Sequence, residues 1–365
     1  MKKTLVVMIA GTVLSGFTVA MAQDAAAPSS WADKISLKGD VRARYESIDE
    51  DGKDTRDRGR IRARLGAYAE VSDEVDAAIA LASGNDDPVS TNETLDNGFS
   101  TKDARLDLAY IDLHPSALPG NLVLGKMTKP FINVNDLIWD GDLNPEGAAL
   151  NLEFGEDTKL FAHVGSFWAE ERSSESETML YSAQAAAEIA LDPAKVTVGA
   201  SYYMYDNMAG FAPLYDEADS FGNSVVEDAD GNLSYLYDYE LVELFTKIGL
   251  KVGLPVELSA NYVVNQEADE NDTGYMVGIK FGKIKDPGSL DVGYSFRELE
   301  ADAVVGVFSD SDFIGGGTDG SGHKLTLNYL IAKNLTGGLT YFMSEKGVDS
   351  GTDYDRLQVD LVVKF

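Results

Sequence analysis

Seven basic side chains stand at alternate positions in two neighbouring stretches near the start of the chain. Alternate residues of an extended strand share one face, so each stretch gathers its basic groups on one side. If a turn near Gly52 joins the stretches, Arg42 lies beside Arg62. The same register places Arg44 beside Arg60, and such a patch would attract mobile anions in a channel. These residues, named here the basic ladder, are Lys38, Arg42, Arg44, Arg58, Arg60, Arg62 and Arg64.

Internal ion pairing is an equally open interpretation of the basic ladder. In the same register Asp40 falls beside Arg64. Glu46 likewise falls beside Arg58. Like charges directly opposite each other destabilise a sheet, so a chain with 61 acidic and 30 basic residues is not expected to carry the ladder by accident. The two interpretations are compatible, since acidic groups facing a basic wall leave a transverse field across the water between them.

A second group of charges lies in the long connection 129–146. Its apolar residues would be unusual on an exposed loop and suit one packed against an interior; they are Phe131, Leu137, Ile138 and Trp139. We therefore expect this connection to fold inward and face the basic ladder, with Lys126 and Lys129 adding to the basic side. Its acidic residues are Asp136, Asp140, Asp142 and Glu146.

Two short segments have the alternate oxygen spacing of a calcium-binding loop. Neither has a glutamate at the twelfth position, which supplies the bidentate ligand in such loops, and acidic turns are common without metal. We therefore expect no metal at either segment. The residues are Asp140, Asp142 and Asn144 in the first segment and Asp228, Asp230 and Asn232 in the second.

Catalysis has little support in the sequence. The three histidines, His114, His163 and His323, fall on different predicted strands with no serine nucleophile motif beside them. The chain has no cysteine, which rules out disulfides, thiolate metal sites and c-type haem attachment. We expect neither enzymatic activity nor a cofactor.

The stretches that carry these charges read as β-strands. In the last one, 354–365, one face is almost wholly apolar and the other largely polar, which suits a barrel wall between lipid and water. About sixteen such strands are predicted, although alternation is poor near 104–129. They lie near 35–46, 58–70, 74–83, 104–113, 121–129, 147–155, 159–169, 178–191, 194–206, 238–252, 256–266, 272–283, 289–299, 322–332, 335–344 and 353–365.

The connections between these strands alternate between short and long, as they do in an outer-membrane barrel. No apolar run of about 18 residues follows residue 22, so only a closed barrel would satisfy the backbone in lipid. Strand-end aromatics predict two belts on the lipid face. Tyr45, Tyr181, Tyr275 and Tyr354 are expected at the outer rim, and Phe154, Phe281 and Phe365 at the inner rim.

The N-terminus reads as an export signal. Lys2 and Lys3 precede an apolar run, and Ala20-Met21-Ala22 forms a small-residue cleavage site. We predict a signal peptide over 1–22, a short periplasmic segment over 23–34 and a transmembrane barrel over 35–365. The formal net charge of -31 argues against nucleic acid or an anionic membrane surface as a partner.

With these features the chain resembles a Gram-negative outer-membrane porin. The terminal strand ending in Phe365 resembles the signal read by the outer-membrane assembly machinery. The segments GKMTKPF (125–131) and DLIWDGDLNPEG (136–147) resemble the putative porin family related to phosphate-selective porins. The resemblance implies a trimer of 16-stranded barrels, each with its third extracellular loop folded inward to narrow the channel.

The expected protein is therefore an all-β transmembrane antiparallel barrel in the outer membrane that lets small hydrophilic solutes and ions diffuse passively. Within that interpretation, general diffusion and a preference for anions remain alternatives. A surface adhesin or scaffold barrel is the rival class, favoured by the long connection 206–236. Small residues on the outward face of the first hairpin suit either contact between subunits or barrel curvature. They are Gly39, Ala43, Gly59, Ala63, Ala67 and Ala69.

Overall fold

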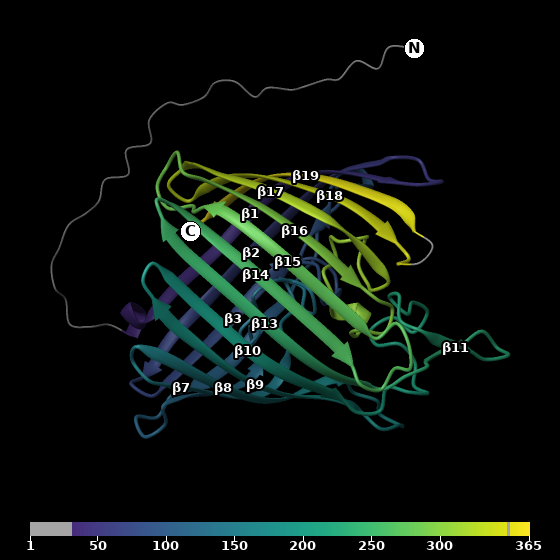
Figure 1. Cartoon of the computed structure of the whole chain (residues 1–365), viewed down its shortest axis with the longest axis horizontal. Coiled ribbons are helices and arrows are strands. Elements are labelled where there is room, and N and C mark those ends of the chain that lie inside the picture. Colours follow the sequence, from purple (N-terminus) through teal and green to yellow (C-terminus); the bar gives the residue numbers. More distant parts are fainter. Residues whose placement is uncertain (1–30, 349–350) are drawn as a thin grey trace, which may run out of the picture.

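The computed structural model describes residues 31–348 and 351–365. The predicted signal peptide and residues 23–30 lie outside the described residues. After the short helical turn η1 (Trp31–Lys34), the described chain forms a closed antiparallel barrel (Figure 1). No helix in this part of the chain is long and apolar enough to cross a membrane.

The barrel is one sheet of 17 strands, and leaving out the two-residue β4 (Glu93–Thr94) gives the predicted sixteen wall strands. The first wall strand pairs with the second and with the last, which closes the barrel. The wall strands are β1 (Ile35–Glu50), β2 (Arg56–Ser72), β3 (Val75–Ser83), β5 (Ala104–Leu113), β6 (Gly120–Lys126), β7 (Glu146–Phe154), β8 (Thr158–Glu170), β9 (Thr178–Leu191), β10 (Ala194–Tyr205), β13 (Tyr239–Val252), β14 (Leu254–Asn265), β15 (Thr273–Gly282), β16 (Leu290–Leu299), β17 (Gly320–Ala332), β18 (Leu335–Lys346) and β19 (Thr352–Lys364).

The first hairpin has the predicted register. Arg42 pairs with Arg62 across β1 and β2, and Arg44 pairs with Arg60. Asp40 likewise stands opposite Arg64, as the pairing interpretation required. The turn at 51–55 contains Gly52 at a positive φ of 78°, which glycine adopts without strain.

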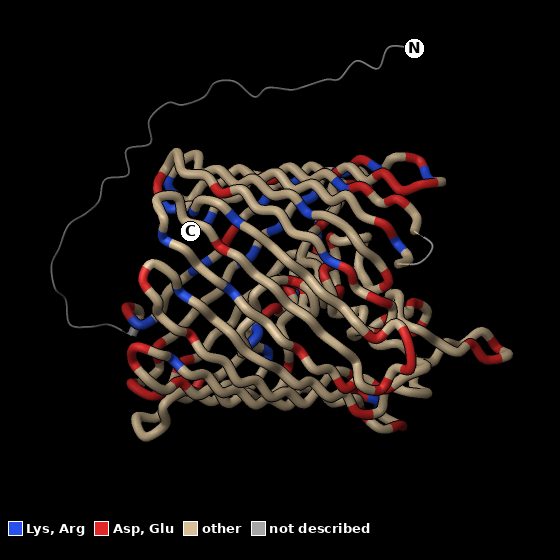
Figure 2. The backbone as a smooth tube through the Cα atoms, in the orientation of Figure 1, with Lys and Arg blue, Asp and Glu red and all other residues tan. Residues whose placement is uncertain are grey.

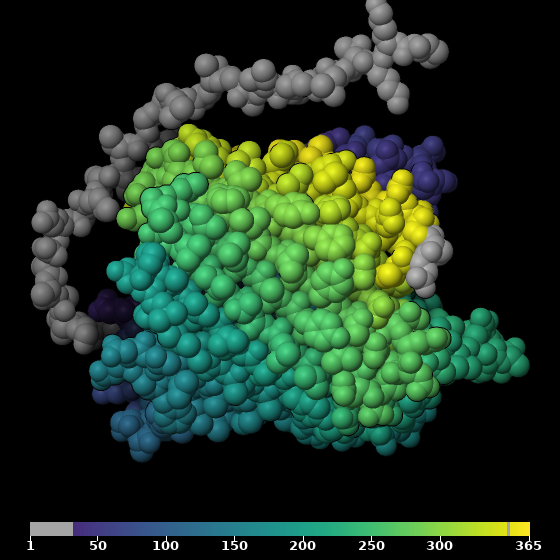
Figure 3. Space-filling model, viewed as in Figure 1, coloured from purple at the N-terminus to yellow at the C-terminus, as the bar shows by residue number. Residues whose placement is uncertain are grey.

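Long connections gather at one end of the barrel and short turns at the other. We number the connections at the long end in chain order, so that four long ones are loop 2 (84–103), loop 3 (127–145), loop 5 (206–238) and loop 7 (300–319). Loop 2 contains η2 (Asn97–Phe99), and loop 7 contains η3 (Gly306–Phe308). Loop 5 contains the hairpin β11 (Val225–Glu227) and β12 (Leu233–Tyr235), which projects beyond the barrel (Figures 1 and 3).

The two faces of each wall strand differ as a lipid-spanning barrel requires. On β19, Val359 and Leu361 are 44% and 46% exposed on the outer surface, whereas Arg356 and Gln358 on the other face are 2% exposed. Acidic positions gather mainly at the barrel ends and in the loops (Figure 2). The alternation read from the sequence therefore assigns the two faces correctly.

The predicted aromatic belts are found with one error. Tyr45, Tyr181 and Tyr275 lie on the outer surface near the long-loop end, and Phe154, Phe281 and Phe365 lie on it near the other end. The prediction that Tyr354 lies on the lipid face at the outer rim was wrong. It shares the inner face of β19 with Arg356, is 3% exposed, and packs beneath the ammonium of Lys346, 4.7 Å from its ring centroid.

Adjacent residues near the middle of β17 test the faces directly. Leu327 is 41% exposed on the outer surface, whereas Thr326 lines an interior hollow. Leu327→Arg should destabilise the barrel by about 2–4 kcal/mol because it places a charge in lipid. The matched change Thr326→Arg places the same charge in water and should cost much less. Urea titrations of the barrel in lipid vesicles measure both, and equal losses would contradict the assigned faces.

Candidate functional site

Loop 3 lies against the interior of the barrel through its apolar residues. Leu137, Ile138 and Trp139 are at most 4% exposed. The ring of Trp139 meets Tyr203 of β10 edge-on at a centroid distance of 5.1 Å. The Ile132 N–H donates to Gln184 Oε1 of β9 at 2.8 Å, so hydrogen bonds as well as packing hold the loop to this wall.

Loop 7 packs beside loop 3, which the sequence analysis did not anticipate. Val304 and Val307 are at most 1% exposed. The Asp140 N–H of loop 3 donates to the Phe308 carbonyl at 2.9 Å, and the Ser311 N–H donates back to Asp140 Oδ2 at 2.9 Å. The apolar run 303–308 in a long acidic connection was the available signal, of the same kind that marked loop 3.

Two buried and two half-buried charges join these two loops to the wall. Asp136 of loop 3 and Asp310 of loop 7 both bind Arg297 of β16, the latter at 3.1 Å. Lys324 of β17 also binds both carboxylates, at 2.7 and 3.5 Å. Burial would raise the pKa of Asp136, but the Arg297 and Lys324 cations outweigh it and hold that pKa well below its usual range. Asp136 therefore meets β16 and β17, not the basic ladder it was predicted to face.

The basic ladder is largely ion-paired. Arg62 and Arg64 share Asp40 at 2.9 and 2.7 Å. They also share Asp142 of loop 3, at 3.6 and 3.2 Å. The pairing of Asp40 with Arg64 is thus found as predicted, and one acidic residue of loop 3 does reach the ladder.

Loop 7 neutralises the neighbouring rungs. Arg44 binds Asp312 at 3.0 Å and Asp360 of β19 at 2.7 Å. Arg356 of β19 binds Asp312 at 2.6 Å and also binds Glu46, which pairs with Arg58 as predicted. Burial would raise the pKa of Asp312, but the guanidiniums of Arg356 and Arg44 outweigh it and hold that pKa well below its usual range.

Two rungs of the basic ladder have neutral partners instead. Arg42 donates to Asn92 Oδ1, and Arg60 donates to Ser90 Oγ at 3.4 Å, both in loop 2. Among the described residues, the Nε–H groups of Arg42 and Arg60 are buried without a hydrogen-bond partner. These two arginines therefore keep most of the uncompensated charge of the ladder.

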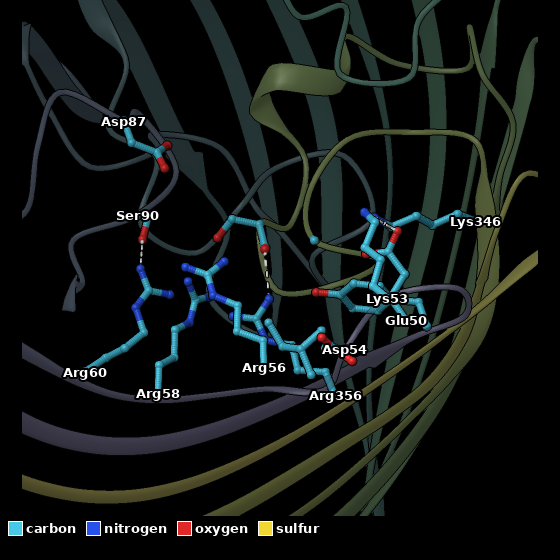
Figure 4. Close-up of a pocket in the computed structure, with 14 residues that line it drawn as sticks. Glu50, Lys53, Asp54, Arg56, Arg58, Arg60, Asp87, Ser90, Lys346 and Arg356 are labelled. Carbon is cyan, nitrogen blue, oxygen red and sulfur yellow. Dashed lines mark hydrogen bonds and ion pairs between the residues drawn. The ribbon is translucent and has the colours of Figure 1, made fainter. Parts of the chain in front are cut away.

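A hollow of about 430 Å³, named here the outer hollow, opens at the long-loop end beside Arg60 (Figure 4). Arg56, Arg58 and Arg60 extend into it from β2, and Asp87 and Ser90 of loop 2 form its opposite side. Lys53 and Lys346 also line it and both bind Glu50, at 2.8 and 3.4 Å.

The remaining predicted site residues lie apart from this cluster. Lys38 stands 5.0 Å over the ring centroid of Tyr68. Lys126 binds Glu146 at 2.8 Å, so these two predicted residues neutralise each other. Lys129 does not extend the basic side as predicted, because it folds back to donate to the Asp140 carbonyl at 2.5 Å. Burial lowers the pKa of Lys129.

The two calcium-like segments are occupied by protein hydrogen bonds. Asp140 accepts from the Asp142 N–H at 2.6 Å, while Asn144 turns away to donate to Asp107 of β5 at 2.8 Å. Asp228 accepts from the N–H groups of Asp230 and Asn232 in its own turn, at 2.8 and 2.9 Å. Across residues 31–348 and 351–365, no group of three or more histidine, aspartate or glutamate side chains is placed to hold a metal ion.

One histidine forms a chain of polar contacts that the sequence did not reveal. His163 of β8 contacts Ser182 of β9 through Nε2 and Asn151 of β7 through Nδ1, each at 2.8 Å. His163 is 5% exposed and Ser182 is 6% exposed, beneath the ring of Phe131. A buried hydroxyl under a loop cannot reach a substrate, so these contacts serve to support loop 3.

The contact between loops 3 and 7 should depend on pH. Burial raises the pKa of Asp140 to about 8, and the carboxylates of Asp310 and Asp142 act in the same direction. An unfolded carboxyl titrates near about 3.9, so between about pH 4 and 8 the folded chain holds a proton that the unfolded chain releases. The free energy of unfolding should therefore fall as pH rises through this window.

Asp140→Asn removes this titration and should flatten that fall. The measurement is the heat denaturation temperature in detergent at pH 5 and pH 8, compared between the variant and the unchanged protein. Asp230→Asn, in an exposed turn, is the matched control and should keep the original dependence. An unaltered dependence in Asp140→Asn would contradict the assignment.

The chain is similar to one protein family and to several solved structures. A family model described as "Putative porin" matches residues 48–228 and 215–365. No curated protein sequence matches the chain.

Among solved structures, OprB of Pseudomonas putida at high pH is similar with a TM-score of 0.63 and 12% identity, covering 92% of this chain and 95% of that one. The trimer form of OmpT from Vibrio cholerae has a TM-score of 0.54 and 12% identity, covering 91% and 100%. The outer-membrane channel DcaP of Acinetobacter baumannii has a TM-score of 0.52 and 15% identity, covering 91% and 97%. At these identities the likeness shows the fold.

Proposed function

Because the chain belongs to the putative porin family, we propose that it lets small hydrophilic solutes and ions diffuse passively through a water-filled interior. The protein is a channel of the Gram-negative outer membrane and not an enzyme. The observation that carries the finer proposal is the set of charged hollows inside the barrel. One of about 430 Å³ opens at the long-loop end, and another of about 330 Å³ lies towards the short-turn end.

We propose that the basic side chains line the vestibules at the two ends of this channel. Arg58 and Arg60 line the outer hollow, whereas Lys38 and Arg64 line the hollow towards the short turns. Most rungs of the basic ladder are neutralised by carboxylates. An anion preference therefore rests mainly on Arg42, Arg60 and Lys38, a smaller charge than the sequence suggested.

A planar-bilayer recording of the purified protein tests the channel. We expect stepwise conductance that rises with salt concentration, because charged side chains line the interior hollows. Heat-denatured protein from the same preparation is the control and should conduct no current. Absence of conductance from folded protein would instead favour the surface adhesin or scaffold. Two observations favour the adhesin or scaffold. Loops 3, 5 and 7 pack in the interior, and the β11–β12 hairpin projects beyond the barrel.

We also propose that three copies assemble through the outer face of the first hairpin. Ala43, Ala63 and Ala67 are exposed there, and small side chains allow close approach of neighbouring surfaces in a membrane. An apolar depression of about 630 Å³ adjoins them, lined by residues that include Ile61, Leu327 and Leu339. The OmpT structure described as a trimer shares the fold.

Native mass spectrometry of the detergent-extracted protein should give three times the mass of one chain. Ala63→Phe should shift the population toward monomer because the larger ring separates the surfaces. Ala162→Phe is the matched control, since Ala162 is exposed on β8, away from the patch. A monomeric unchanged protein would contradict the proposal.

A further inference from the structure

Three hollows follow one side of the barrel interior and meet at shared residues. A hollow of about 500 Å³, named here the middle hollow, lies at the long-loop end and shares Asp87 and Ser90 with the outer hollow. The hollow of about 330 Å³, named here the inner hollow, lies towards the short turns. The middle and inner hollows share Asp107, Asp142 and Asn144.

The loops cover the middle rungs of the basic ladder, since Arg42, Arg44 and Arg62 line none of the three hollows. Loop 2 contacts Arg42 and Arg60, loop 3 contacts Arg62 and Arg64, and loop 7 contacts Arg44. Three loops thus rest on the wall formed by β1 and β2. The shared residues of the middle and inner hollows lie instead on β5 and in the last residues of loop 3 before β7.

A local irregularity of β5 directs one carboxylate to this point. The pairing of β3 with β5 shifts so that Leu81 meets Leu106 and Ala80 meets Leu108, which leaves Asp107 without a partner. A bulge of this kind redirects a side chain and is common beside functional sites. The Asp107 carboxylate accepts from Asn144 at 2.8 Å, and no cation binds it within 4.0 Å among the described residues.

The approach to this point is acidic, unlike the outer hollow. The middle hollow is lined by five acidic residues and two basic ones; the acidic residues are Asp86, Asp87, Asp107, Asp142 and Glu146, and the basic ones are Arg105 and Lys126. Arg105 leans toward Asp103, and Lys126 is bound to Glu146. Charges more than about 8 Å away are screened at physiological salt, so the unpaired carboxylate of Asp107 dominates where the middle and inner hollows meet.

We propose that the passage runs between residues 141–144 of loop 3 and the β3–β5–β6 wall, and that Asp107 makes it favour cations over anions. This rests on the proposed channel function and reverses the preference that the basic ladder suggested. Asp107 lines both hollows from the wall, and Asp142 lines both from the loop. Arg62 and Arg64 neutralise Asp142, so an anion entering the middle hollow meets the uncompensated carboxylate of Asp107.

A single introduced cysteine tests the path, because the chain has none of its own. Gly141 lines the inner hollow, and a Cβ added there meets open space. In Gly141→Cys channels, a cationic methanethiosulfonate reagent should cut the conductance, and should react faster than an anionic one. The control is Ser259→Cys, which lines a hollow on the β14–β17 side. Its modification should leave the conductance nearly unchanged.

Reversal potentials in a salt gradient test the charge. Asp107→Asn should lower the ratio of potassium to chloride permeability by up to about fivefold at low salt, and less at high salt. Asp291→Asn is the matched control, because Asp291 is a buried interior carboxylate on β16 that lines neither hollow. It should leave the ratio unchanged.

The outcomes distinguish a failure of the proposed channel function from a failure of the proposed path or of the role of Asp107. An unchanged protein that conducts nothing overturns the channel function. A conducting protein whose selectivity is the same in Asp107→Asn overturns the role of Asp107. Conductance that falls on modification at Ser259→Cys but not at Gly141→Cys places the passage on the opposite side of loop 3 and overturns the path.

Discussion

Lipid offers no hydrogen-bond partner to a peptide group, and this constraint determines the rest of the molecule. It requires the first and last strands to pair, because an open edge would leave a row of unsatisfied groups in hydrocarbon. The closed wall then has only two faces. Each charged residue within a wall strand must turn to the interior or lie near a rim, so Arg42, Arg44, Arg60 and Arg62 necessarily crowd together inside.

Crowded guanidiniums need counterions, and the loops supply them. A buried charge left without its partner costs about 3–5 kcal/mol, which strongly favours an inward position of Asp142 and Asp312. Packing acts in the same direction, since Trp139 of loop 3 and Val307 of loop 7 are almost fully buried. Electrostatics and the hydrophobic effect thus hold the same two loops inside the barrel.

Strand positions, facing and the Arg42–Arg62 register could be predicted from the sequence because they depend on local alternation and one tight turn. Partners across the interior could not. Asp136 meets Arg297, which is 161 residues away in the chain, and no spacing rule relates them. The irregular alternation near 104–129 was visible as a weakness of the pattern. Its cause is the bulge that leaves Asp107 without a partner on β3. That bulge cannot be found without knowing the register of β3 against β5.

The contacts that neutralise the basic ladder also cover its middle rungs, Arg42, Arg44 and Arg62. Side chains covered by loops 2, 3 and 7 are poorly placed to meet mobile ions. Selectivity should then pass to carboxylates that line the hollows without a bound cation, such as Asp107. A ladder of basic residues in the sequence of a barrel therefore indicates where loops dock as readily as where anions pass, and the loop carboxylates decide between the two.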